Sequence, residues 1–279
     1  MKASGPGLII TADDFGLHAS VNLAVERACR EGVLSTASLM VAAPAAIDAV
    51  ARARANPHLR VGLHLVLADG RAMLPPRAIP DLVDANGNFG NRMARDGARF
   101  FLLPKVRRQL AFEIRAQFEA FAATGLQLDH ANAHKHFHLH PTILSMMIAI
   151  GRPFGLRAIR LPREENMTTM LRPWLALLAQ RLAASGIAHN DYMFGIRQSG
   201  GFDEAVLLAA LSNLPARGVS EIYLHPATRS GAAVTRSAPH YHHAAELAAL
   251  LSPRVRQAHD RLRAQGFSFG GFADLAAPP

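Results

Sequence analysis

Apolar residues along the chain form short continuous runs that alternate with longer stretches of helical spacing. The short runs predict buried strands at residues 8–12, 38–42, 61–67, 127–134, 158–161, 192–195, 221–225 and 267–269. The helical stretches, bounded by Gly, Asn and Pro, predict helices at residues 20–31, 45–55, 104–123, 141–150, 171–184, 203–211 and 244–265. Regular alternation of strand and helix predicts an α/β fold with a parallel sheet, closed or nearly closed into a barrel of about seven strands.

One long segment, residues 68–103, interrupts the alternation and is typical of a loop excursion, with a turn at residues 84–88. No internal repeat and no low-complexity linker divides the rest of the sequence. Apolar residues make up 50% of the chain, which is enough for a sizeable core. We therefore expect one domain over residues 1–279.

The formal net charge is +9 and the isoelectric point is near 10.8, yet the arginines are scattered over the predicted helices. No dense basic run with interleaved aromatic residues occurs, so nucleic-acid binding is not favoured. A basic surface can instead hold a protein near anionic lipid headgroups. The apolar residues 73–76 and 100–103, followed by Arg107 and Arg108, are compatible with such a membrane contact. Ordinary packing of these residues against the barrel is the alternative.

The chain shows neither a signal-peptide pattern at its start nor an apolar, uncharged stretch of about 18 residues. Its single cysteine, Cys29, excludes an internal disulfide and is typical of a small buried hydrophobic residue. We therefore expect a cytoplasmic protein, with peripheral contact at the inner face of the membrane as a further option. These features leave the oligomeric state open, and a homodimer is compatible with them.

The segment from residue 129 to residue 141 concentrates the metal-binding chemistry of the chain. Five of the fourteen histidines lie within eleven residues, on alternate positions interrupted once by Asn132. Alternate side chains of a strand face one side of a sheet, and neutral imidazole is the commonest protein ligand of metals. The spacing therefore indicates a divalent metal site. A solvated strand face or a metal-storage tract is the alternative, although the apolar residues between the histidines argue against storage.

Two more predicted strands carry ligand-type residues at or near their ends. Asp13 and Asp14 follow the first strand, and His64 interrupts the apolar run of the third. In a parallel barrel the chemistry lies at the carboxyl ends of the strands, where these residues would meet His134 and His225. Paired carboxylates beside histidines favour metal-assisted hydrolysis. Helix capping by the two acids and a structural core role for His64 are the alternatives.

At these motifs the chain resembles the YdjC/ChbG-like carbohydrate deacetylase family. The motifs follow one another in family order: Ala12-Asp13-Asp14-Phe15-Gly16, Gly62-Leu63-His64, His130-Ala131-Asn132-Ala133-His134 with His136, His138 and Pro141, and Leu224-His225-Pro226-Ala227. Within the family, residues 11–22, 61–67 and 134–141 most resemble HpnK, the branch associated with hopanoid biosynthesis.

The resemblance implies a distorted (β/α) barrel with metal ligands at Asp14, His64 and His134 and a general base at Asp13. On an extended strand, neighbouring side chains point opposite ways, which would keep Asp13 away from the metal unless the chain bends. The usual His-x-Asp-x-His motif of the family has Asn132 in place of the acid. An amide can accept the N–H of a ligand histidine but adds no negative charge, so a lower metal affinity is expected.

Amide hydrolysis also needs a proton for the departing amine, and His225 is the candidate donor; a structural His is the alternative. We assign His136 and His138 to the surroundings of the ligands or to substrate contacts. Arg160 and Arg163 flank a predicted strand end, where they could bind substrate hydroxyls or the Asp13 carboxylate, or form a solvated rim pair.

The residues predict metal-assisted hydrolysis, and the family resemblance implies that the protein is a metal-dependent N-deacetylase that releases acetate from an N-acetylglucosamine glycoconjugate. The HpnK resemblance implies an N-acetylglucosaminyl hopanoid lipid as substrate, and soluble chitooligosaccharides are the alternative. The ligand set suits zinc and also manganese or iron, while the family resemblance keeps magnesium open. Two readings compete with deacetylation: a metal enzyme that cleaves a glycosidic or phosphate ester bond, and a non-enzymatic, histidine-rich metal- or lipid-binding protein.

Overall fold

A computed structural model of the protein describes residues 5–164, 171–231, 234–235 and 238–276. In this part of the chain, seven strands form one sheet in which every pairing is parallel. The strands are β1 (Gly7–Phe15), β2 (Thr36–Leu39), β3 (Arg60–Leu65), β4 (Leu128–Ala133), β5 (Tyr192–Phe194), β6 (Val219–Leu224) and β7 (Ser268–Phe269). They lie in the order β4-β3-β2-β1-β6-β5, and β7 pairs with the start of β1.

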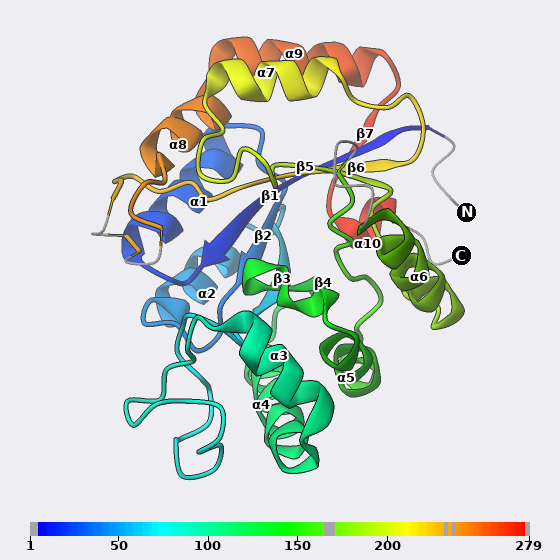
Figure 1. Cartoon of the computed structure of the whole chain (residues 1–279). Coiled ribbons are helices and arrows are strands. Elements are labelled where there is room, and N and C mark those ends of the chain that lie inside the picture. Colours follow the sequence, from blue (N-terminus) through cyan, green and yellow to red (C-terminus); the bar gives the residue numbers. More distant parts are fainter. Residues whose placement is uncertain (1–4, 165–170, 232–233, 236–237, 277–279) are drawn as a thin grey trace.

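Helices surround this sheet (Figure 1). They are α1 (Ala19–Glu31), α2 (Ala46–Ala55), α3 (Met93–Leu102), α4 (Pro104–Ala123), α5 (Pro141–Gly151), α6 (Leu171–Ala184), α7 (Glu204–Ser212), α8 (His243–Leu251), α9 (Pro253–Ala264) and α10 (Phe272–Leu275), with 3₁₀ helices η1 (His134–Leu139) and η2 (Arg152–Phe154). Every residue of β1 is buried, since this strand lies between β2 and β6 and is covered by helices. No helix among the described residues combines the length and apolar character needed to cross a bilayer.

The sheet is completed irregularly between β4 and β5. Ala131 of β4 forms an isolated parallel bridge with Ile159, and Ala158 forms another with Ala188. The predicted strand at residues 158–161 is therefore reduced to bridges. The reason is local: the side chain of Asn190 replaces a strand neighbour, accepting from the N–H of Leu161 at 2.7 Å and donating to its carbonyl at 2.9 Å. The seven strands form a half-barrel, and residues 158–161 extend it beside β4. This architecture confirms the predicted α/β class and the distorted barrel.

Two further predicted elements differ from the structure. The helix predicted over residues 244–265 is two helices, α8 and α9, because Pro253 cannot supply the N–H that a continuous helix needs. Ser252 caps α9, its hydroxyl accepting from the N–H of Arg254 at 3.1 Å. The excursion at residues 68–103 is also more ordered than predicted, since it contains helix α3 and two isolated antiparallel bridges.

Candidate metal centre and active site

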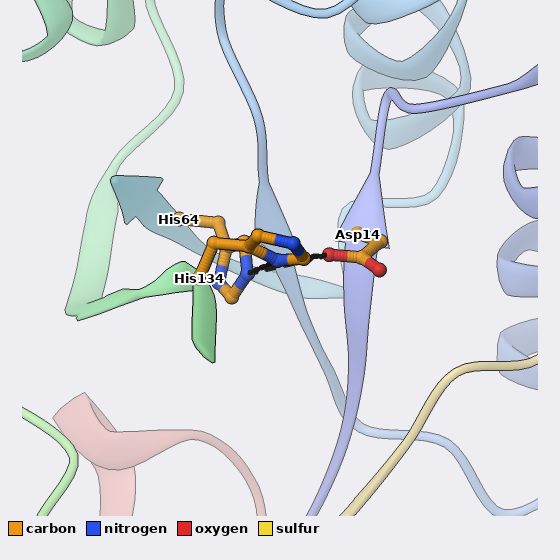
Figure 2. A group of neighbouring side chains, drawn as sticks. All are labelled: Asp14, His64 and His134. Atoms are coloured by element: carbon orange, nitrogen blue, oxygen red, sulfur yellow. Dashed lines mark hydrogen bonds and ion pairs between the residues drawn. The ribbon is translucent and has the colours of Figure 1, made fainter. Parts of the chain in front are cut away.

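Asp14, His64 and His134 point their side chains toward one another (Figure 2). Asp14 lies near the end of β1, His64 near the end of β3, and His134 directly after β4. All three strands are parallel, so their carboxyl ends meet at one edge of the sheet. The structure thus brings together the three residues that the family resemblance implies as ligands.

The end of β1 is bent, which changes where its two carboxylates point. Asp14 has a φ of 61°, and the register of β1 against β2 shifts between Ala12 and Phe15. Positive φ is uncommon outside glycine but is tolerated by Asp. Because of the bend, Asp13 and Asp14 line the same pocket rather than opposite faces of the sheet. The prediction that Asp13 and Asp14 point in opposite directions, as neighbours on an extended strand do, is therefore wrong.

The three candidate ligand atoms form a compact triangle. The distance from Asp14 Oδ1 to His64 Nε2 is 3.3 Å and to His134 Nδ1 is 3.1 Å, and the two nitrogens are 3.3 Å apart. Asp14 Oδ1 is buried and has no hydrogen-bond partner among the described residues. Two imidazoles and one carboxylate with a shared focus are the donor set of catalytic zinc sites, which keep a further position open. The residues present therefore fit a divalent metal.

Asp13 is held by a buried arginine instead of by the histidines. Arg160 Nη1 donates to Asp13 Oδ2 at 2.5 Å and Nη2 to Oδ1 at 3.0 Å, while the same guanidinium binds Glu221. Burial alone raises the pKa of Asp13, but the charge and hydrogen bonds of Arg160 hold it well below its usual range. The Asp13 carboxylate is therefore ionised. The sequence offered Arg160 and Arg163 as partners of Asp13 or of the substrate. Arg160 binds Asp13, whereas Arg163 is exposed and does not line the pocket.

Sequence reasoning missed Glu221, whose signal was an acid in the middle of an apolar strand. Glu221 Oε1 accepts from the hydroxyl of Thr11 at 2.7 Å and from Arg160 Nη2 at 2.7 Å. The buried guanidinium of Arg160 lies between the carboxylates of Asp13 and Glu221 and forms hydrogen bonds with both. Glu221 therefore holds Arg160, and Arg160 in turn fixes the position of Asp13.

Asn132 lies behind His64 in the same buried network. Its Oδ1 is 2.6 Å from His64 Nδ1, and its Nδ2 is 3.0 Å from Ser38 Oγ. This orientation suits metal binding, because a His64 that binds metal through Nε2 carries its proton on Nδ1 and donates it to Oδ1. The opposite amide orientation would place Oδ1 2.9 Å from Arg160 Nη1 but turn Nδ2 toward His64. Asn132 therefore cannot accept from His64 and from Arg160 at once.

We expect Asn132→Asp to bind metal on the order of tenfold more tightly, because a carboxylate can accept from His64 and Arg160 together and adds negative charge. Asn132→Leu should weaken binding by about 10- to 100-fold, since it leaves His64 Nδ1 without an acceptor. Competition against a chromophoric chelator measures both. Equal affinity in all three proteins would contradict an orienting role for Asn132.

The remaining histidines of the cluster do not continue a strand. Lys135 and His136 have φ values of 56° and 55°, which break the alternation after β4 and form a kink inside η1. The strand prediction is therefore wrong beyond Ala133. His138 turns inward, accepting from the N–H of Ala133 at 3.1 Å and lying 3.0 Å from the carbonyl of Arg160. Burial lowers the pKa of His138 to about 3, so it is a neutral group that stabilises the turn.

His136 and His225 both line the pocket that contains Asp13 and Asp14. His136 Nε2 lies 3.3 Å from the hydroxyl of Tyr223, and burial lowers its pKa well below the usual range. His225 follows β6 directly, and its Nδ1 is buried without a partner among the described residues. Burial also lowers the pKa of His225.

The pocket has a volume of about 260 Å³ and is closed by residues that the sequence did not single out. Tyr241 stands over His225 with ring centroids 5.1 Å apart, and its hydroxyl is 2.8 Å from Ser199 Oγ. Tyr223 contributes a second ring, 5.5 Å from His225. Tyr241 and Ser199 come from loops outside the motifs, where no periodic pattern marks them.

Known proteins with similar sequences cover nearly the whole chain. The sequence profile of YdjC-like proteins matches residues 7–261. A carbohydrate deacetylase of Brevibacillus brevis is 32% identical over 263 residues, which cover 91% of this chain and 95% of the relative. A chitooligosaccharide deacetylase of Serratia marcescens is 31% identical over 272 residues, which cover 96% of this chain and 98% of the relative.

Among solved structures, a protein of Enterococcus faecalis named a "putative cellobiose-phosphate cleavage protein" superposes with a TM-score of 0.77 at 24% identity. The match covers 98% of this chain and 100% of that protein, and it shows the same fold. With the motifs, the barrel and the sequence profile in agreement, the chain belongs to the YdjC-like protein family.

Proposed function

We propose that this protein is a metal-dependent carbohydrate N-deacetylase. The observation that carries the proposal is the division of labour between two neighbouring carboxylates in one pocket. Asp14 faces His64 and His134, whereas Asp13 is held by Arg160. One carboxylate is thus available as a ligand and the other as a base. Its relatives named carbohydrate deacetylase and chitooligosaccharide deacetylase support the same activity.

In this mechanism Asp14, His64 and His134 would hold the metal. A divalent metal held by these residues would lower the pKa of water and polarise the acetamide carbonyl. Asp13, kept ionised and oriented by Arg160, accepts the proton of the attacking water. His225, whose Nδ1 has no partner among the described residues, would give a proton to the departing amine from its imidazolium form and then recover the proton that Asp13 took from the water. His136 borders the same space and contacts the substrate.

Zinc is the metal that we propose, because two imidazoles and one carboxylate suit it. Manganese and magnesium are the alternatives. Elemental analysis of protein purified without added metal distinguishes them.

The substrate that we propose is an N-acetylglucosamine glycoconjugate, with an N-acetylglucosaminyl hopanoid lipid as the specific case. Only the terminal sugar has to enter a pocket of about 260 Å³, so a large apolar group can remain outside. The family motifs and their resemblance to the hopanoid-associated branch support the lipid. Such a substrate requires peripheral contact with a membrane. A soluble chitooligosaccharide is the second candidate, because the Serratia marcescens relative is named for it.

We expect the purified protein to release acetate from N-acetylglucosamine conjugates and to leave the glycan chain length unchanged. Acetate assay and mass spectrometry of the product measure both, with the lipid-linked sugar and chitobiose as parallel substrates. Faster turnover of the lipid-linked sugar would support the hopanoid assignment, and faster turnover of chitobiose the second candidate. Shortened glycans, or inorganic phosphate in place of acetate, would contradict deacetylation.

A further inference from the structure

Residues 101–108, which we name the α3–α4 corner, connect helices α3 and α4 and expose a continuous apolar segment. Phe101, Leu102 and Leu103 are 58%, 67% and 45% exposed, and the next residue, Pro104, is exposed as well. Single exposed apolar residues are common on protein surfaces, but a run of four is not. Phe100 is buried, whereas its three apolar neighbours keep about half or more of their surface exposed.

Cations border this segment, and two of them have no acidic partner in the part of the chain that the structure describes. Arg107 Nη2 donates to the carbonyl of Phe101 at 2.9 Å, which places its guanidinium beside the apolar run. Arg108 is exposed on the next position of α4. Neither arginine forms an ion pair within the described residues, whereas Lys105 lies 3.0 Å from Asp81. The corner therefore combines exposed apolar side chains with positive charge that no described acid neutralises by an ion pair.

The residue before the exposed segment packs on the part of the chain that follows the candidate ligand His134. Phe100, directly before the exposed segment, packs on Phe137 and His140 with ring centroids 5.6 and 6.3 Å apart. Gly97 lies so close to His140 that a Cβ would be 3.2 Å from its ring. Phe137 belongs to η1, which begins at the candidate ligand His134. The corner is thus connected, through Phe100, to the segment that begins at His134.

We propose that the α3–α4 corner forms a contact site for a bilayer that contains anionic lipid. Apolar side chains enter the interface between headgroups and acyl chains, and the arginines attract the anionic headgroups. The inference rests on the proposed function for its purpose, since a glycolipid deacetylase has to work at a membrane. The exposure and the charge of the corner are independent of that purpose.

A second copy of the chain fits this corner less well. In a twofold dimer the same patch meets itself, so Arg107 and Arg108 of both copies would come together without acidic partners. A stable interface also buries about 800 Å² per partner, whereas a few apolar side chains of this size offer only about half of that. Anionic lipid complements both features of the corner.

Co-sedimentation with vesicles tests the proposal. We expect the protein to bind vesicles of phosphatidylcholine mixed with phosphatidylglycerol, and to bind phosphatidylcholine alone or mixed vesicles at high salt much less. The double variant Phe101→Ser/Leu102→Ser should lose on the order of tenfold in vesicle binding. Leu177→Ser is the matched control, because Leu177 is 53% exposed on α6 and should not affect binding. Arg107→Gln/Arg108→Gln should remove the dependence on salt.

Acetate release from a soluble substrate is measured for the same proteins and should be unchanged, since the corner does not line the pocket. Vesicle binding by the Phe101→Ser/Leu102→Ser variant equal to that of the unaltered protein would overturn the proposal. A dimer that this variant dissociates would also overturn it, by assigning the corner to a second copy. Absence of vesicle binding with full deacetylation would refute the corner alone, and vesicle binding without any deacetylation would refute only the proposed function.

Discussion

Replacing any one of Asp14, His64 or His134 by alanine is expected to remove the metal and to abolish acetate release. The three candidate ligand atoms lie 3.1–3.3 Å from one another, so each replacement takes away a third of the protein donors. Two remaining donors hold a divalent metal too weakly to retain it through purification. Elemental analysis, acetate release and thermal unfolding are measured on each variant, so that loss of the site is separated from loss of the fold.

His136→Ala is the control for these three variants. His136 lines the same pocket, but its Nε2 faces the hydroxyl of Tyr223 and not the candidate ligands. We expect this variant to keep one equivalent of metal. A full equivalent in His134→Ala together with a loss in His136→Ala would move the third ligand to His136 and contradict the assignment.

Asp13→Asn is expected to keep the metal and to lose turnover by about 100- to 10,000-fold, the usual cost of removing a general base. The amide has the shape of the carboxylate and can still accept from Arg160, which Glu221 also holds in place. What the variant loses is the ability to take up a proton. Metal stoichiometry and acetate release are therefore measured on the same preparation.

Glu221→Gln is the matched control for Asp13→Asn. It removes one negative charge from the same arginine, but Glu221 lies behind Arg160 and does not line the pocket. We expect its turnover to stay far above that of Asp13→Asn. If metal and activity disappear together in Asp13→Asn, then Asp13 is a ligand, and the base would be sought first at His136.

Much of this architecture is predictable from sequence because periodicity reports burial. The apolar runs before Asp14 and around His64 mark strands that the sheet buries, and parallel strands bring their carboxyl ends to one edge. The meeting of Asp14, His64 and His134 follows from that rule. The fold class follows from the alternation of strand and helix.

What the sequence did not predict depends on backbone bends and on partners distant along the chain. Positive φ at Asp14 and His136 cannot be derived from side-chain periodicity, yet these bends direct Asp13 into the pocket and end the strand after Ala133. The pairing of Arg160 with Glu221 joins residues 61 positions apart. Tyr241 lines the pocket from a loop, and the apolar periodicity of the sequence does not predict where a loop residue lies in the fold.

The central claim is that one divalent metal, held by Asp14, His64 and His134, is required for deacetylation. The most direct test is to remove metal with a chelator and to titrate zinc back while acetate release from an N-acetylglucosamine conjugate is followed. We predict that release stops without metal and returns to a plateau at one equivalent of zinc per chain. Acetate release that persists in the metal-free protein, or a plateau only after several equivalents, would contradict this account.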